Sequence, residues 1–242
     1  MRKLFVIVLA LLAFSPAFSQ NKTKKEKKKF SIGNRAGDHL MFQLSSDHWI
    51  GAADSVSNHI KGFSRGANLY VMMDKPFKGN PRFSAAFGIG VSTSHIFFKR
   101  MVVDIASRTP VLPFYQLDTA SNFKKFKVTT AYLEVPIELR FTSRPDEPNK
   151  SFKFAAGLKL GTLLSAATKG KNFRDNNGNL INSSTPKTKN KSYFNNTRLA
   201  ATARVGLGNF TLFGAYNITT MFKDEVAPDT KLLQVGLTFS GL

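Results

Sequence analysis

Apolar and polar residues alternate along much of the chain, which is the period expected of β-strands with two different faces. Between residues 131 and 141, for example, Leu133, Val135 and Ile137 occupy every second position. After about residue 38 no helical period persists. Eight alternating segments can be counted, at about 39–47, 65–74, 83–97, 127–142, 151–167, 192–207, 210–221 and 232–241. The pattern therefore predicts an all-β fold.

The lengths of these segments and of the links between them point to a membrane. Many segments exceed the usual strand of a soluble sheet and are long enough for a tilted membrane crossing. The links alternate between long and short, which is typical of outer-membrane barrels with long outside loops and short periplasmic turns. An even number of strands places both chain ends in the periplasm. We predict an eight-stranded antiparallel up-and-down transmembrane β-barrel over residues 38–242.

Hairpin registers follow from matching apolar positions with each other. Gly208-Asn209 is the shortest link and predicts a two-residue turn that pairs Leu207 with Phe210. For the hairpin of 127–142 and 151–167 the same rule predicts three apolar and two charged pairs. These pairs are Val135–Leu158, Leu139–Phe154, Phe141–Phe152, Glu134–Lys159 and Arg140–Lys153.

An eight-stranded barrel is just wide enough for its inward side chains to fill it. The polar faces of the strands would point into this lumen, and we expect a charge network there in place of an open pore. The expected network is Glu134, Glu138, Arg140, Lys153, Lys159, Arg198 and Arg204. Aromatic residues near both ends of the segments predict two interfacial girdles. They are Phe141, Phe152, Phe210 and Phe239 at one end and Trp49, Phe97, Phe98, Tyr193 and Phe222 at the other.

The first residues carry the features of a secretory signal peptide. Arg2 and Lys3 precede an apolar run over 4–14, and Ala17-Phe18-Ser19 then provides small residues before a cleavage site at Gln20. A run of this length is too short for a membrane-spanning helix. We expect a signal peptide over 1–19 and a basic periplasmic leader over 20–37, which places the barrel in the bacterial outer membrane.

The formal charge of +20 suggests nucleic acid at first sight. An exported protein does not normally meet DNA, so we expect no nucleic-acid partner, and outer-membrane lipid or lipopolysaccharide is the expected counterpart. The outer loop 168–191 holds a basic cluster that either contacts phosphates or acidic glycans or keeps a mobile loop soluble. The cluster is Lys169, Lys171, Arg174, Lys187, Lys189 and Lys191.

Candidate catalytic and metal-binding residues are few. The chain has no cysteine, which excludes disulfides, a thiol nucleophile and cysteine-ligated metals. Ser92 and Ser94 share one face of a predicted strand while His95 lies on the other, so they do not form a local catalytic pair. The remaining histidines show no metal-ligand spacing. We therefore expect no enzyme activity, no metal and no cofactor.

Three motifs are characteristic: Tyr132-Leu133-Glu134-Val135-Pro136-Ile137-Glu138-Leu139, then Gly157-Leu158-Lys159-Leu160-Gly161, and finally Val235-Gly236-Leu237-Thr238-Phe239. With these motifs, the chain resembles the Bacteroidota outer-membrane β-barrel family typified by PorT. The resemblance covers roughly residues 30–242. It implies an outer-membrane barrel and, in PorT itself, a part in protein export by the type IX secretion system, with secretion-system proteins as partners. Two alternatives stay open. One is a lipid A-modifying barrel enzyme, and the other is a surface adhesin or receptor acting through the outer loops 99–126 and 168–191.

Overall fold

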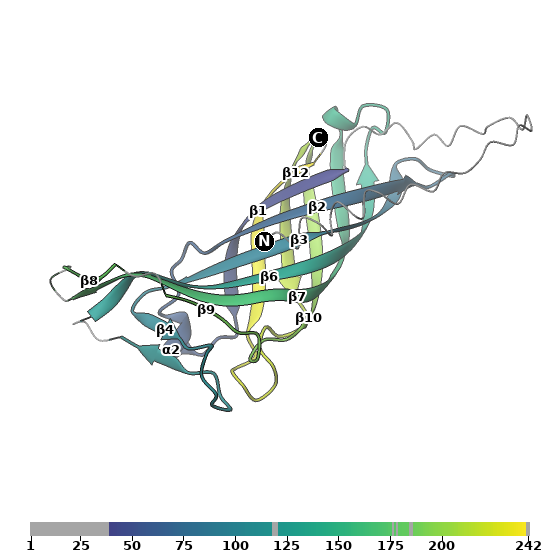
Figure 1. The fold of residues 1–242 in the computed structure, drawn as a ribbon. Coiled ribbons are helices and arrows are strands. Elements are labelled where there is room, and N and C mark those ends of the chain that lie inside the picture. The colour runs from purple at the N-terminus through teal and green to yellow at the C-terminus, as the bar shows by residue number, and fades with distance from the viewer. Residues whose placement is uncertain (1–38, 118–120, 176, 178, 184–185, 241–242) are drawn as a thin grey trace, which may run out of the picture. The chain divides into compact units, whose positions relative to one another are not determined.

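The computed structural model describes residues 39–240, except 118–120, 176, 178 and 184–185. Eight of its strands form a closed antiparallel ring in which each strand pairs with its neighbours in the chain and the last strand pairs with the first (Figure 1). The ring strands are β1 (Leu40–Ile50), β2 (Arg65–Pro76), β3 (Phe83–Phe98), β6 (Ser121–Thr142), β7 (Phe152–Asp175), β10 (Thr197–Leu207), β11 (Phe210–Asn217) and β12 (Lys231–Ser240). The predicted eight-stranded up-and-down barrel is confirmed.

The remaining elements are short and belong to the connections. They are α2 (Asp54–Ser57), β4 (Met101–Val103), β5 (Phe114–Gln116), β8 (Leu180–Asn182), β9 (Lys187–Lys189) and the 3₁₀ turn η1 (Pro148–Lys150). Strands β4 and β5 pair with each other, and β8 and β9 both pair with β7. Within the described residues, no helix is long and apolar enough to cross a membrane. The predicted signal peptide and leader lie outside the described residues.

The connections differ in length between the two ends of the ring. Links 77–82, 143–151 and 208–209 lie at one end, which we call the short-turn end, and links 51–64, 99–120, 176–196 and 218–230 lie at the other, which we call the long-loop end. Figure 1 shows β4, β8 and α2 gathered at the long-loop end, away from the end of β12.

Several strand ends differ from the prediction. The hairpin of β6 and β7 continues past the expected loop boundaries, so parts of 99–126 and 168–191 are strand. Aromatic packing supports this extension, since the ring of Phe123 lies 5.8 Å from that of Phe126 and 4.9 Å from that of Phe173. Conversely, residues 192–196 and 218–221 leave the predicted strands and instead bury apolar side chains at the long-loop end.

The register of the β10–β11 hairpin is as predicted, with Leu207 opposite Phe210 and Gly208 at φ +57° in the turn. The predicted register of β6 against β7 is wrong by two residues. Val135 lies opposite Leu160, Glu134 opposite Gly161 and Arg140 opposite Ala155. The link includes η1 and the buried Ser151, whose hydroxyl donates to the carbonyls of Arg144 and Glu147, and these hydrogen bonds place the turn one residue later. A two-residue shift leaves every side chain on its predicted face.

The two faces of the ring differ in chemistry as the alternation predicted. The outward face of β6 and β7 is apolar and exposed, as Ile137, Leu139 and Leu158 show. The inward face is buried and mainly polar from the middle of the ring to the short-turn end, apart from a small apolar cluster of Met41, Tyr70, Met72 and Ala86, and it is apolar at the long-loop end. The apolar part is a core cluster to which the β4–β5 loop contributes Met101, Val103, Ile105 and Leu112. These loop residues close the mouth of the barrel, and we call this cluster the apolar plug.

The predicted aromatic girdle at the long-loop end is wrong for four of its five residues, and only Phe97 lies on the outward face. The Trp49 ring lies 5.5 Å from the rings of Phe98 and Phe222, and these three residues and Tyr193 are buried in the apolar plug. They occupy inward positions of their strands or fold in from the loops, so they face the lumen and not lipid. At the short-turn end, the predicted aromatics form cross-strand pairs, such as Phe210 with Phe239 at 4.9 Å.

Candidate functional site: the charged lumen and the basic hairpin

The centre of the lumen holds an ion pair between strands that are not neighbours. Arg198 on β10 places Nη1 2.7 Å from Oε1 of Glu134 on β6, and both side chains are almost fully buried. Strand β7 lies between them and presents Gly161 to both residues. A Cβ atom at this glycine would lie 3.0 Å from Cγ of Glu134. The absence of a side chain at Gly161 therefore leaves the space across which the two charges meet.

Polar groups from four further strands complete this ion pair. Arg198 also donates to Asn217 Oδ1 at 2.8 Å, to Gln234 Oε1 at 3.1 Å and to Ser92 Oγ at 3.3 Å. The Tyr70 hydroxyl donates to Glu134 Oε2 at 2.6 Å. A buried ion pair is stable only when its remaining donors and acceptors are satisfied. The network connects β2, β3, β6, β10, β11 and β12, and so ties opposite sides of the ring together.

Lys159 crosses the lumen alongside this pair and is 1% exposed. Its Nζ donates to Gln43 Oε1 at 3.0 Å and lies 5.0 Å and 5.4 Å from the ring centres of Tyr70 and Phe213. Aromatic faces attract a desolvated ammonium group. The sequence prediction placed Glu134 opposite this lysine, whereas the structure places Lys159 opposite Pro136.

A second ionic cluster lies nearer the short-turn end. Glu138 Oε2 accepts from Arg140 Nε at 3.0 Å and from Arg204 at 3.2 Å and 3.0 Å. Arg140 Nη1 lies 3.7 Å from Asp74 Oδ1, which also accepts from Ser84 Oγ at 2.7 Å. One carboxylate thus serves two guanidinium groups. Ala155 on β7 lies opposite both arginines and leaves room for them, as Gly161 does in the first cluster.

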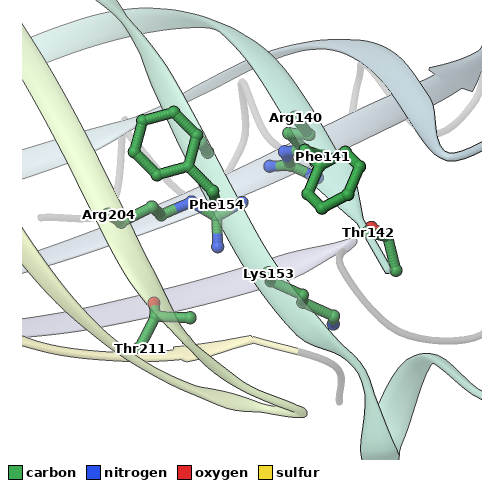
Figure 2. Close-up of a pocket in the computed structure, with 8 residues that line it drawn as sticks. Arg140, Phe141, Thr142, Lys153, Phe154, Arg204 and Thr211 are labelled. Carbon is green, nitrogen blue, oxygen red and sulfur yellow. The ribbon is translucent and has the colours of Figure 1, made fainter. Parts of the chain in front are cut away.

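Figure 2 shows the end of this cluster, where Arg140, Lys153 and Arg204 approach from neighbouring strands. A small cavity of about 10 Å³ is lined by these cations with the side chains of Thr142 and Thr211. This volume is about that needed for a single water molecule. A single water molecule would therefore fill the space left between these side chains.

The seven residues predicted for the lumen network all lie inside the ring and are buried. Two carboxylates were missed. Asp47 is 1% exposed and accepts from Ser45 and Gln234, and Asp74 belongs to the second cluster. Both continue the inward parity of their strands, which is the signal that could have identified them. With them, the described lumen holds five cations and four carboxylates.

The six predicted loop cations lie at the long-loop end, on or beside the extended hairpin. Lys169, Lys171 and Arg174 are on β7, Lys187 and Lys189 are on β9, and Lys191 follows. They are therefore held in a paired sheet and not in a simple loop. On β3, Ser92 Oγ donates to Asn68 in the lumen, whereas the His95 ring contacts Thr129 on the outward face. The serine and histidine are on opposite faces, as the alternation predicted.

The comparison with protein families supports a membrane barrel. A family model described as "Outer membrane protein beta-barrel domain" matches residues 18–220. No curated protein sequence matches the chain. Among solved structures, the chain is similar to Ail, the attachment invasion locus protein of Yersinia pestis, at 13% identity and a TM-score of 0.35, covering 85% of this chain and 98% of that one. A structure of Ail with the heparin analogue sucrose octasulfate gives 14% identity, a TM-score of 0.36 and coverage of 84% and 97%.

The family match covers the ring from β1 to β11, and β12 completes the closure. The chain belongs to the outer membrane protein beta-barrel domain family, and the protein is therefore a barrel of the bacterial outer membrane.

Proposed function

We propose that this protein is a closed, non-conducting barrel that acts as a structural or accessory component of protein export, as the PorT-like resemblance implies. The observation that carries the proposal is the filled lumen. The apolar plug closes the long-loop end, and the two ionic clusters occupy the middle and the short-turn end. Such a barrel offers no path for diffusion, so its contribution is made by its surfaces.

The proposed orientation has the short-turn end and both chain ends in the periplasm. Outer-membrane barrels have short periplasmic turns and longer outside loops. Here the link at 208–209 has two residues, whereas 99–120 and 176–196 are much longer. In this orientation the extended β6–β7 hairpin and the apolar plug lie at the cell surface.

The closed state and the export role can be tested separately. Reconstituted into a planar bilayer, the full chain is expected to give no stable conductance steps, and porin-like steps would contradict the closed lumen. In mild detergent, the tagged protein is expected to co-purify with secretion components from its host. A variant with an intact ring but no residues 101–116 provides a control for capture through the long-loop end. Recovery of the barrel alone, under conditions that keep other membrane complexes intact, would contradict the export role.

A second candidate function is a surface receptor or adhesin. A cleft of about 550 Å³ at the long-loop end favours it, with residues 106–110 on one side and residues 188–193 on the other. Its rim includes Arg108 and Lys189, which suits an anionic ligand. Cells that carry Arg108→Gln and Lys189→Gln together are expected to lose adhesion to an acidic glycan surface. Unchanged adhesion would remove this candidate.

A further inference from the structure

Four like-charged side chains meet on the outward face of the barrel near the long-loop end. Lys127 on β6 lies directly opposite Lys169 on β7, and Lys169 lies directly opposite Lys187 on β9. Arg65 on β2 completes the group, because its guanidinium group and the Lys127 ammonium group each lie 5.6 Å from the ring centre of Phe97. We call these four cations the basic rim.

Directly opposite like charges destabilise a sheet. Arg65, Lys169 and Lys187 all lie close enough to Lys127 to repel its charge. Lys127 is therefore the centre of this repulsion. Among the residues that the structure describes, no carboxylate forms an ion pair with any of the four cations. The next pair along the hairpin, Lys125 opposite Lys171, repeats the same like-charge arrangement. The basic rim is therefore a positive site that an external anion would stabilise.

The height of the basic rim relative to the apolar face identifies the anion. On β6, outward residues run from Phe141 through Ile137 to Ala131, which is about 34 Å along the strand and about 24 Å along the membrane normal for a tilt near 45°. This matches the apolar band of about 25 Å in outer-membrane barrels. Lys127 lies four residues further, about 10 Å beyond that band on the same scale.

The cross-strand rows show the same transition. Leu69, Val91 and Leu133 form an apolar row, and three rows further on lies the row of Phe97, Lys127, Lys169 and Lys187. Of the two intervening rows, the first carries Thr93 and Ala131, and the second carries His95 and Thr129 together with Arg65 of the basic rim. An apolar face, a narrow polar band and then clustered cations is the order in which a lipid presents its chains, its backbone and its phosphates.

We propose that the basic rim binds the phosphate groups of a phosphorylated membrane lipid whose acyl chains lie against the apolar outward face of β3, β6 and β7. All four cations of the basic rim contact phosphate. The Phe97 ring holds the Arg65 and Lys127 side chains at the headgroup level. The site rests on the membrane placement of the barrel described above, and needs neither the export role nor any secretion partner.

The test uses the full chain in detergent, titrated with diphosphorylated lipid A and observed by native mass spectrometry. The variant Lys127→Gln/Lys169→Gln/Lys187→Gln removes the row. Its matched control is Lys75→Gln/Lys78→Gln/Lys150→Gln, which removes three exposed lysines at the short-turn end. Each lysine near an anionic surface contributes on the order of a fivefold change in affinity, so the row variant should bind roughly 100-fold more weakly and the control variant as the wild type does.

Three further arms identify the source of the anion. Dephosphorylated lipid A should bind as weakly to the wild type as lipid A binds to the row variant. Inorganic phosphate and a soluble sulfated glycan should each bind far more weakly than lipid A. Equal binding of the dephosphorylated lipid, or equal binding by the row and control variants, would overturn the site, and tighter binding of the glycan at the same lysines would show that the occupant is wrong. Heat-modifiable migration in SDS gels verifies that each variant retains the barrel, so a loss of binding is separated from a loss of fold.

Discussion

Arg198 and Glu134 form a 2.7 Å ion pair across an intervening strand, and only the glycine at position 161 of that strand separates their side chains. The pair is the centre of a network that fills the barrel. The network therefore contributes to the stability of the closed barrel.

Replacing Glu134 with Gln should cost about 3–5 kcal/mol of unfolding free energy, because the buried Arg198 guanidinium loses its counter-charge. The double variant Glu134→Gln/Arg198→Met removes both charges and should cost clearly less than the sum of the single changes. Urea unfolding of the barrel folded into lipid vesicles measures both values. Additive costs would mean that the two charges do not interact in the folded barrel.

A side chain at position 161 should disrupt the same pair without changing any charge. A Cβ atom there would lie 3.0 Å from Cγ of Glu134, and the methyl groups of valine would extend into the gap. Gly161→Val is expected to lower the unfolding free energy by about 1–3 kcal/mol, as overpacking does. Gly214→Val is the matched control on β11, where an added Cβ atom meets nothing within 4 Å. Equal losses for the two variants would show that the loss at position 161 does not come from the ion pair.

The chain has one tryptophan, Trp49, and its fluorescence therefore reports on one site. Because the side chain is buried in the apolar plug, neither acrylamide in water nor brominated acyl chains in lipid should quench its emission strongly. The variant Trp49→Phe/Ile137→Trp moves the fluorophore to the exposed outward face of β6, where brominated lipid should quench it. Strong lipid quenching of Trp49 itself would restore the girdle interpretation.

The absence of cysteine permits labelling at single introduced thiols. Asp224 is exposed at the long-loop end and Asn80 is exposed at the short-turn end. In intact cells, Asp224→Cys should react with a membrane-impermeant maleimide and Asn80→Cys should react only after the outer membrane is permeabilised. The reverse pattern would contradict the proposed orientation while leaving the fold unaffected.

Alternation along the chain was sufficient to predict the eight ring strands and to place Glu134, Glu138 and Arg198 on the inward face. It could not determine the β6–β7 register, because pairs of apolar residues match equally well after a two-residue shift, and hydrogen bonds of Ser151 in the link decide between the two. The sequence also could not show which inward side chains meet across the ring. Glu134 meets Arg198 over Gly161, and this depends on the curvature of three strands together.

The sequence contains a pattern that indicates the apolar plug, but we interpreted the aromatic residues in it as an interfacial girdle. The inward face of β3 changes from Ser92 and Ser94 to Ile96 and Phe98, which breaks the polar inward pattern close to the loop. In β6, Phe126 and Val128 show the same change. Apolar residues at inward positions near a strand end indicate that a loop folds back over the mouth, whereas the placement of aromatic residues near the strand ends suggested an interfacial girdle.

The pairing of β12 with β1 has a consequence for how the molecule is made. The free edge of β1 is paired only when β12 is in place, so every incomplete form exposes two unpaired strand edges together with an apolar outer surface. Contacts of such large sequence separation also make folding slow. A truncation that removes β12 leaves both edges unpaired, and it is therefore expected to be degraded and not to persist as an open sheet.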